Sequence, residues 1–308
     1  MPFPSPSSSD AVYGLPPRDL VEVAPGAVQC SPLVPGSTAL GAIELGSLRS
    51  AVVMAPPSTI ERRHVVALAL RALAPGAPLI VLAPKVKGGA RLAAELTAFG
   101  CEMETMSKSH HRIVRTTRPA APNGLDEAIE AGQPCYLAGL EMWSQPGLFS
   151  YDRIDPASAL LLSLLPPLKG RGADLGCGIG VLSRAILMSP NVSHLTLVDI
   201  DRRAIAAAAR NIRTGGATLL WADVRTTKEL PMGLDFVVMN PPFHEGGAED
   251  RALGPVFIAK AAAHLRPGGT LWLTANRHLP YEPVLAALFK AVTQVDQANG
   301  YKIHEARK

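Results

Sequence analysis

The sequence predicts an α/β protein whose second part forms a mostly parallel, doubly wound sheet, and three observations support this prediction. Short apolar runs typical of strands alternate with helical patterns of ordinary length from residue 170 onward. Glycines are concentrated in DLGCGIG, between the first of these strands and the next helix. Of the 308 residues, 47% are hydrophobic and 18% are charged, which is enough for one large domain or two ordinary ones.

The first third of the chain is expected to form a smaller α/β domain. Helical periodicity covers TIERRHVVALALRAL, and a short apolar strand follows within APGAPLIVLAP. A second helix is expected in KGGARLAAELTAFG and another strand around HHRIVRTT, which resembles a Rossmann-type half without a glycine loop. The predicted boundaries are a disordered tail at residues 1–18, this domain at 19–118, a linker at 119–134 and the main domain at 135–308.

The main domain is more regular. It begins with the helix DPASALLLSLLPPL, where Asp155 is a suitable N-cap and Pro156 the first helical residue. Strand, loop and helix then alternate through GRGADLGCGIGVLSRAILM, HLTLVDID, RRAIAAAARNIRTGG, ATLLWADV and LDFVVMNPPF. A helix in DRALGPVFIAKAAAHLRPGG, a strand in TLWLTAN and a final strand in GYKIHEARK complete the pattern. Asp201, directly before RRAIAAAA, is expected to cap that helix.

Composition excludes several classes of protein. No apolar run approaches the roughly 18 residues that a membrane-spanning helix needs, and the first residues lack the features of a secretory signal. The cysteines, Cys30, Cys101, Cys135 and Cys177, have no C-x-x-C spacing, so we expect reduced thiols and no metal site. A net charge of +4 suits contact with phosphates. We therefore expect a soluble, cytoplasmic protein.

The glycine loop indicates a cofactor of nucleotide type. Gly176, Gly178 and Gly180 lie between a strand and a helix, where a side chain would block the approach of a cofactor to the backbone. A dinucleotide loop of the form G-x-G-x-x-G would place its third glycine at position 181, but that residue is Val181. This departure disfavours a nicotinamide-dependent oxidoreductase.

Three acidic residues accompany the loop. Asp199 ends the next strand, where its carboxylate can accept both hydroxyl groups of a ribose, and Asp223 ends the strand after that, where it can accept the amino group of an adenine. Asp174, just before the first glycine, could order the loop or meet the ammonium group of a methionine moiety. Together these residues fit S-adenosyl-L-methionine better than a pyrophosphate cofactor.

The strand FVVM ends in Asn240, Pro241, Pro242 and Phe243, at the edge of the sheet where open α/β folds bind ligands. Oxygens of the Asn240 side chain and the Pro241 carbonyl could accept both hydrogens of a planar amine and offset the charge that a methyl group brings. Pro242 would stiffen the turn, and Phe243 could stack on a flipped base. An alternative interpretation gives this segment no function: two prolines end the strand, Asn240 forms the turn and Phe243 lies in the core. His244 and Glu245 are expected to be ordinary loop residues.

The motifs DLGCGIGVLS, VDID and NPPFH resemble those of class I S-adenosylmethionine-dependent methyltransferases that modify an exocyclic nitrogen. QPGLFSYDRIDPASALLLSLL, NPPFHEG, TANRHLPYEPVL and GYKIHEARK resemble, more narrowly, the ribosomal RNA small subunit methyltransferase C family. This resemblance implies a Rossmann-like methyltransferase fold with a mostly parallel seven-stranded sheet, preceded by a smaller degenerate methyltransferase-like domain. It also implies formation of N2-methylguanine in 16S rRNA.

Carried over residue by residue, the resemblance assigns the cofactor to the three glycines and Asp199, and the target amine to Asn240, Pro241 and Phe243. Phe149 and Ser150 match a family segment that covers the site. Two departures stand out, since the N-terminal region is shorter than in the family and Asp223 replaces a different polar residue of some members. The partner expected is RNA, with neither DNA nor a membrane, and the protein is expected to be a monomer.

Two basic stretches could contact RNA phosphates, namely SKSHHRIVRTTR and the group Lys85, Lys87 and Arg91. Basic residues of this kind also protect the exposed edge of a sheet, and the sequence favours neither interpretation. Two other functions remain open besides guanine methylation. One is methylation of a glutamine or another amide, although Tyr is commoner than Phe in that motif. The other is a non-catalytic RNA-binding assembly factor.

Overall fold

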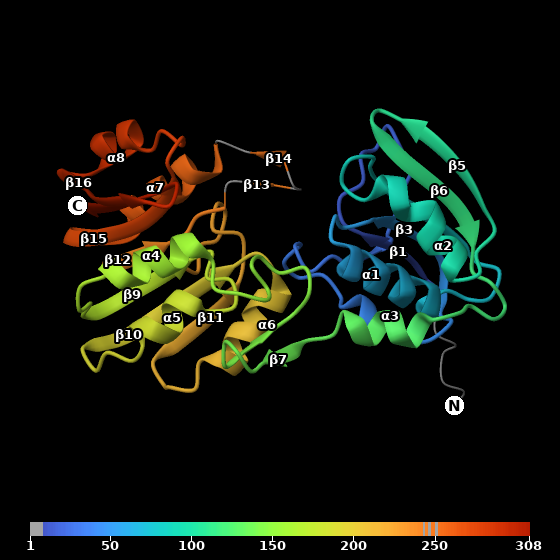
Figure 1. Cartoon of the computed structure of the whole chain (residues 1–308), viewed down its shortest axis with the longest axis horizontal. Coiled ribbons are helices and arrows are strands. Elements are labelled where there is room, and N and C mark those ends of the chain that lie inside the picture. The colour runs from blue at the N-terminus through green and yellow to red at the C-terminus, as the bar shows by residue number, and fades with distance from the viewer. Residues whose placement is uncertain (1–8, 243, 246–247, 250–251) are drawn as a thin grey trace. The chain divides into compact units, whose positions relative to one another are not determined.

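The computed structural model describes residues 9–242, 244–245, 248–249 and 252–308, and the chain forms two compact units (Figure 1). The first unit comprises residues 1–133 and the second residues 134–308. Each unit has a sheet of its own, with six strands in the first and seven in the second.

The sheet of the first unit has the strand order β2-β1-β3-β4-β6-β5. Its strands are β1 (Ser9–Tyr13), β2 (Val28–Gln29), β3 (Leu48–Met54), β4 (Pro78–Pro84), β5 (Met103–Lys108) and β6 (His111–Thr117). Its helices are α1 (Thr59–Ala72), α2 (Leu92–Ala98) and α3 (Leu125–Ala131), with short 3-10 turns η1 (Leu40–Ala42) and η2 (Gly89–Arg91). Strands β2, β1, β3 and β4 are mutually parallel, whereas β6 is antiparallel to both β4 and β5.

Two of the ranges predicted for this unit are corrected by the structure. Strand β1 lies within the predicted disordered tail of residues 1–18 and pairs with β3, while residues 1–8 are outside the described residues. Helix α3 lies within the predicted linker of residues 119–134 and buries Ala128 and Ile129. Its Ile129 carbonyl oxygen lies 2.7 Å from Nδ1 of the buried His64 on α1. Long-range pairing and burial thus order segments whose Pro and Gly content suggested otherwise.

The second unit has the strand order β11-β10-β9-β12-β15-β17-β16, as the predicted seven-stranded, mostly parallel sheet requires. These strands are β9 (Gly170–Leu175), β10 (Val192–Asp199), β11 (Ala217–Trp221), β12 (Leu234–Met239), β15 (Leu265–Asn276), β16 (Ala291–Ala298) and β17 (Tyr301–Arg307). The helices are α4 (Pro156–Leu164), α5 (Val181–Ile186), α6 (Arg202–Asn211), α7 (Leu253–His264) and α8 (Glu282–Leu288). Strand β17 is antiparallel to β15 and β16.

Two small hairpins lie outside this sheet. One pairs β7 (Cys135–Leu137) with β8 (Met142–Ser144), and the other pairs β13 (His244–Glu245) with β14 (Ala248–Glu249). In the sheet itself the predicted strands and helices are confirmed, and the structure adds α8 and β16, which the sequence analysis did not predict.

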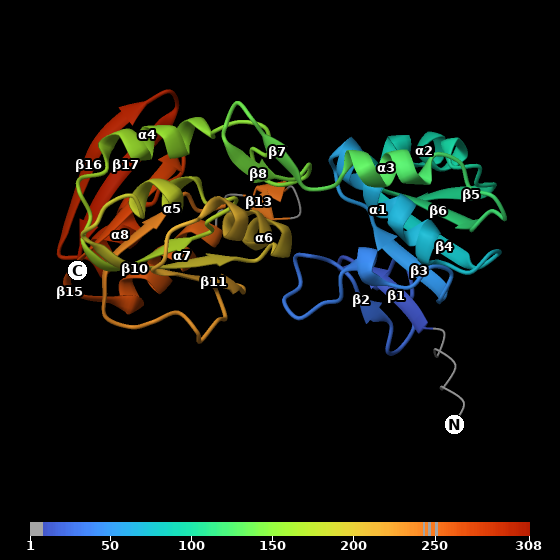
Figure 2. The same cartoon turned by 90° about the horizontal axis from the view of Figure 1, so that it is seen from below.

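Helices cover both faces of the second sheet (Figure 2). On β12 the side chains alternate, so that Val237 and Met239 join the core under α7 and α8, while Phe236 and Val238 join the core under α4, α5 and α6. Both faces are apolar, as is typical of a parallel sheet. Within the part of the chain that the structure describes, no helix has the length and hydropathy that crossing a membrane would require.

Candidate active site

The parallel strands β9, β10, β11 and β12 all end at one edge of the second sheet, and the predicted site residues follow those ends. Asp199 is the last residue of β10 and pairs in register with Trp221, the last residue of β11. Val238 on β12 pairs with Asp174 on β9, so the residues after both strands lie side by side. The carboxyl edge of a parallel sheet is the usual ligand site of such folds.

The glycine loop follows β9 and leads into α5. Gly176, Gly178 and Gly180 have φ angles of +78°, +53° and +87°, a region that other residues rarely adopt. A Cβ atom added at Gly178 would meet nothing within 4 Å, so the backbone there borders open space. The loop therefore needs glycine both for its conformation and for the approach of a ligand.

Asp199 holds this loop in place. Its Oδ2 atom accepts a hydrogen bond of 2.8 Å from the Gly178 N–H, and its Oδ1 atom accepts one of 2.8 Å from the Asp201 N–H. Burial raises the pKa of Asp199 to about 6. The carboxylate retains lone pairs for further donors, which is what binding of ribose hydroxyl groups requires.

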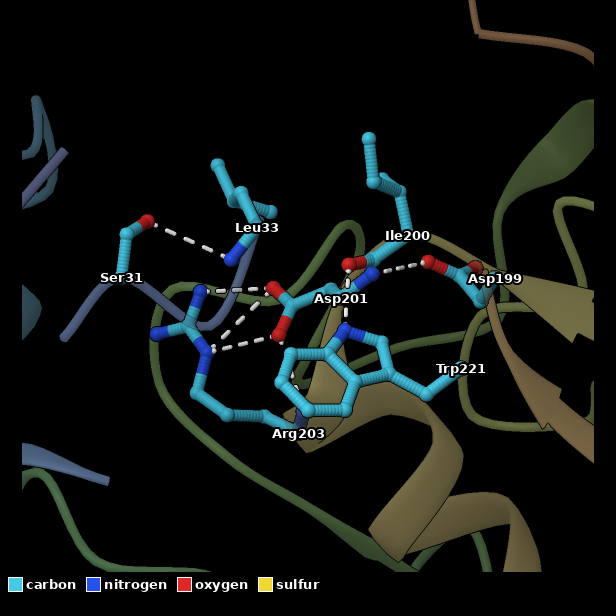
Figure 3. Close-up of polar contacts among 7 residues, drawn as sticks. All are labelled: Ser31, Leu33, Asp199, Ile200, Asp201, Arg203 and Trp221. Carbon is cyan, nitrogen blue, oxygen red and sulfur yellow. Dashed lines mark hydrogen bonds and ion pairs between the residues drawn. The ribbon is translucent and has the colours of Figure 1, made fainter. Parts of the chain in front are cut away.

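Asp201 caps α6, as predicted, because its Oδ1 atom accepts the Arg203 N–H at 2.9 Å. The Arg203 guanidinium also pairs with this carboxylate at 2.7 Å (Figure 3). In the same view the Trp221 indole N–H donates to the Ile200 carbonyl oxygen at 2.9 Å and so ties β11 to the end of β10. Two aspartates two residues apart thus have different tasks, one in the loop and one in the helix cap.

Asp174 is completely buried at the end of β9. Its Oδ2 atom accepts a 2.6 Å hydrogen bond from the Ser183 hydroxyl group on α5, so it orders the start of that helix. Its Oδ1 atom has no hydrogen-bond partner among the described residues. Burial, together with the nearby charge of Asp199, raises the pKa of Asp174 to about 7. An oxygen of this kind calls for a donor from a ligand.

Asp223 lies two residues beyond β11 and forms an ion pair with Arg225. The two side chains approach to 2.8 Å, and the Arg225 backbone N–H also donates to this carboxylate at 2.8 Å. Burial acts to raise the pKa of Asp223, but these contacts outweigh it and hold the pKa below its usual value. The carboxylate is therefore ionised, and Arg225 fixes its position.

Asn240 directly follows β12, and its side-chain amide has a fixed orientation. The Nδ2 atom donates to Oδ2 of Asp155 at 2.8 Å and to the hydroxyl group of Ser158 at 2.9 Å, both at the start of α4. Because a carboxylate only accepts hydrogen bonds, the amide nitrogen must face α4. The Oδ1 atom therefore points away from α4 and can accept a hydrogen bond from a ligand.

The two prolines bring this strand end to the glycine loop. Pro241 is buried and Pro242 is exposed. A Cβ atom added at Gly176 would lie 3.8 Å from Cδ of Pro242 and 3.6 Å from Phe257, so the loop and the strand end are close neighbours. Phe243 lies outside the described residues. His244 and Glu245 belong to the β13–β14 hairpin.

Phe149 and Ser150 are predicted to cover the site, but among the described residues neither forms a hydrogen bond with Asn240 or with the glycine loop. Phe149 is 63% exposed, and Ser150 has a left-handed φ angle of +46° in the turn that precedes α4. This turn ends at Asp155, which caps α4 as predicted by accepting the Ser158 N–H at 3.0 Å. Asp155 therefore links this turn to Asn240.

These observations fit S-adenosylmethionine. The backbone at Gly178 borders open space, Asp199 can accept further hydrogen bonds, and the Oδ1 atom of Asp174 calls for a donor. A cofactor with a ribose, an ammonium group and a positive sulfonium centre meets all three needs.

Comparison with known proteins identifies the family. Residues 139–305 match the family model of the methyltransferase small domain. The ribosomal RNA small subunit methyltransferase C of Pseudomonas paraeruginosa is 33% identical over 270 residues, which cover 86% of this chain and 80% of that protein. That of Shewanella loihica is 31% identical over 268 residues, covering 83% and 76%. The chain belongs to the ribosomal RNA small subunit methyltransferase C family. The resemblance found in its motifs is thus confirmed.

A solved structure supports the same membership of the methyltransferase C family. The T. thermophilus 16S rRNA N2 G1207 methyltransferase, in complex with AdoMet and guanosine, superimposes with a TM-score of 0.78 at 25% identity. The match covers 100% of this chain and 89% of that protein. The predicted Rossmann-like fold with a smaller preceding domain is therefore confirmed.

Sequence reasoning missed the partners that orient Asn240 in this family member. Asp155 was predicted only as a helix cap, and Ser158 was not singled out, because both are more than 80 positions from Asn240 along the chain. The one available signal was the position of Asp155, directly after the segment GLFSYDRI that resembles the family. The ion pair of Asp223 with Arg225 was also missed, although the spacing of two residues is local.

Proposed function

We propose that this protein transfers a methyl group from S-adenosyl-L-methionine to the exocyclic N2 amine of a guanine in small-subunit ribosomal RNA. The observation that carries the proposal is the fixed amide of Asn240. Its nitrogen is held by Asp155 and Ser158, and its oxygen, which accepts no hydrogen bond from the described residues, is available to an incoming amine. Membership of the methyltransferase C family and the AdoMet and guanosine bound by its T. thermophilus relative support the choice of donor and base.

The chain's own groups account for activation of the amine. The nitrogen of a guanine N2 amine is a weak nucleophile because its lone pair is delocalised into the ring. Hydrogen bonds to Oδ1 of Asn240 and to the Pro241 carbonyl oxygen would draw the nitrogen toward tetrahedral geometry and offset its developing positive charge. The cofactor supplies an electrophilic methyl group on its sulfonium sulfur. Transfer would form a carbon–nitrogen bond and break the carbon–sulfur bond, the thioether would leave with that electron pair, and the amine would then lose one proton to water.

The remaining roles belong to the same proposal. Gly176, Gly178, Gly180, Asp174 and Asp199 would hold the cofactor, with Asp223 at its adenine, while Phe243, Pro242, Phe149 and Ser150 would enclose the base. The protein would act as a monomer in the cytoplasm on RNA. The first unit would support folding and contact RNA through the exposed Arg115 on β6. Arg118, in contrast, donates to the Leu70 carbonyl oxygen within that unit.

The test is methylation of small-subunit RNA from a strain that lacks this protein. Purified protein, tritiated S-adenosylmethionine and either 16S rRNA or assembled 30S subunits are combined, and the nucleosides are analysed by mass spectrometry. We expect N2-methylguanosine as the labelled product. Label in a protein glutamine would instead favour amide methylation, and undetectable cofactor binding in calorimetry would favour a non-catalytic assembly factor. Either result would overturn the proposal.

A further inference from the structure

A pocket of about 320 Å³ lies within the second unit, between the β7–β8 hairpin and the ends of α5 and α6. It takes no part in the site described above. Two aromatic residues, Tyr136 and Trp143, and three arginines, Arg184, Arg210 and Arg213, are among its lining residues. Aromatic rings combined with guanidinium groups are typical of surfaces that bind unpaired nucleotides.

The aromatic residues form a ready stacking surface. Tyr136 and Trp143 face each other across the β7–β8 pair, with ring centroids 5.8 Å apart and planes at 62°. The Arg210 guanidinium lies over the Trp143 ring at 4.5 Å from its centroid. Tyr136 is 46% exposed, so part of its ring is open to solvent. A base could stack on its free face.

The charges of the pocket favour an anion. Three arginines and one acidic residue, Glu141, line it, which leaves a net charge of +2. Glu141 pairs with Arg184, which donates to its carbonyl oxygen at 2.7 Å and approaches its carboxylate at 3.5 Å. Arg210 and Arg213 are exposed, and a guanidinium stacked on an indole keeps its N–H groups available at its edge. Such groups bind phosphate oxygens well.

The wall of this pocket is tied to the glycine loop by one buried amide. Oδ1 of Asn211 accepts the Trp143 N–H at 2.6 Å, and Nδ2 donates to the carbonyl oxygens of Trp143 and Ile179, each at 2.9 Å. Ile179 lies between Gly178 and Gly180 in the loop. The hairpin therefore shares a hydrogen-bond network with the proposed cofactor site.

We propose that this pocket binds an unpaired nucleotide of the RNA substrate, with its base stacked on Tyr136 and its phosphate held by Arg210 and Arg213. The nucleotide is a different one from the methylated guanine, and the pocket serves as a second point of attachment for the RNA. This inference rests on the proposed function, since it takes the substrate to be RNA. It adds a site outside the motifs that carry the resemblance to the family.

The test compares Tyr136→Ala and Arg213→Ala with Arg307→Ala. Arg307 is a matched control because it is an exposed arginine of the same unit, with a side chain 62% exposed, but does not line the pocket. We expect both pocket variants to raise the KM for RNA by about fivefold or more, as loss of one stacked base or one phosphate contact would. The kcat, the affinity for S-adenosylmethionine and the melting temperature should match those of the control.

A second measurement uses fluorescence anisotropy to monitor direct binding of a short single-stranded RNA from the methylated region. For Arg213→Ala the slope of log affinity against log salt should fall by about 1, whereas for Tyr136→Ala it should stay constant. Unchanged RNA affinity in both variants overturns the inference and leaves the proposed function intact. Wild-type protein that binds RNA through this pocket but transfers no methyl group overturns the proposed function alone.

A third outcome separates RNA from a protein partner. If the variants impair methylation of assembled 30S subunits but not binding or methylation of naked RNA, the pocket contacts a ribosomal protein. That result would also overturn the inference.

Discussion

The two units share a strand arrangement, but only the second retains the features of a cofactor site. The order β2-β1-β3-β4-β6-β5 of the first sheet matches β10-β9-β12-β15-β17-β16 of the second, with the same sequence of parallel and antiparallel pairs. The first sheet has no counterpart of β11 among its described strands. The first unit therefore resembles a copy of the second that has lost part of its cofactor-binding half.

The covering of the sheets differs accordingly. Helices α1, α2 and α3 all contribute to one core of the first unit, and the opposite face is covered by a small cluster that includes Leu20 and Val21. In the second unit α4, α5 and α6 cover the corresponding face. Helix α4 holds the partners of Asn240, and α5 follows the glycine loop. Both helices lie on the face whose counterpart in the first unit has no helix among the described residues.

The ends of matched strands show how the chemistry differs. Strand β3 leads into Ala55-Pro56-Pro57, whereas β12 leads into Asn240-Pro241-Pro242. In the first unit the completely buried Arg62 donates to the carbonyl oxygens of Pro56, at 3.2 Å, and Pro57, at 2.7 Å, and it pairs with Glu95 at 2.7 Å. In the first unit the prolyl carbonyl oxygens at this position therefore already accept hydrogen bonds from a side chain of the protein, and not from a substrate amine.

The loop after β1 in the first unit and the glycine loop after β9 in the second are each held by a residue at the end of the next strand, and these two residues differ. Gln29 at the end of β2 accepts the Ser31 N–H at 2.8 Å and donates to the Gly14 carbonyl oxygen at 2.9 Å. This arrangement parallels that of Asp199, which accepts the N–H two residues on and one from the glycine loop. A neutral amide has replaced a carboxylate, so the loop is held but no charge remains for a ligand. Holding the loop therefore requires only a hydrogen-bonding side chain, whereas binding the proposed cofactor requires a carboxylate.

The largest expected effect concerns stability of the first unit. Arg62→Met leaves Glu95 buried without its partner, and we expect it to lower the free energy of unfolding by about 3–5 kcal/mol. Arg49→Met is the control, since that arginine forms an exposed pair with Asp10 and should cost less than about 1 kcal/mol. Urea denaturation measures both. Equal losses in the two variants would show that the buried pair does not hold this unit together.

The second effect concerns chemistry in the second unit. Asn240→Ala removes the oxygen that accepts the amine, and we expect kcat for methyl transfer to fall by about 10²- to 10³-fold. Binding of S-adenosylmethionine, measured by calorimetry, should be unchanged. Full activity of Asn240→Ala would rule out its role.

Much of this site could be predicted from the sequence, because its parts are local. The glycine loop follows directly on β9, Asp199 ends β10, and Asn240 ends β12, so each position could be read from a strand and the residues after it. The orientation of Asn240 could not be predicted, since Asp155 meets it only through tertiary structure. Strand β1 and helix α3 were missed for the same reason, because distant partners stabilise them and their own composition does not.

The smallest expected effect is in the pH dependence of cofactor binding, which follows from the proposed roles of Asp174 and Asp199 in the second unit. Burial raises the pKa of Asp174 to about 7 and of Asp199 to about 6 in the free protein. A positively charged cofactor favours the ionised forms and lowers both pKa values, so affinity is full above pH 7 and weakens as pH falls through these values. We expect about a tenfold loss between pH 8 and pH 5.5, equivalent to one pKa unit.

Calorimetry across this pH range measures the effect, and Asp199→Asn should remove the lower step, since an amide does not titrate. Affinity that is independent of pH would contradict the assignment of these carboxylates to the cofactor. Without cofactor the sign reverses. The folded protein then binds more protons than the unfolded chain, whose aspartates titrate near pH 4, so the free energy of unfolding falls as pH rises from about 4 to about 7.

Asp155 has two tasks, and from their combination we expect heat to remove activity before it unfolds the protein. Its Oδ2 atom caps α4 and also accepts the Asn240 amide. Helix ends fray at a lower free energy than global unfolding. When the first turn of α4 opens, Asn240 loses the contact that fixes its side chain while the sheet remains intact. Activity should therefore decline on heating before circular dichroism detects any melting, and S-adenosylmethionine should still bind the inactivated protein.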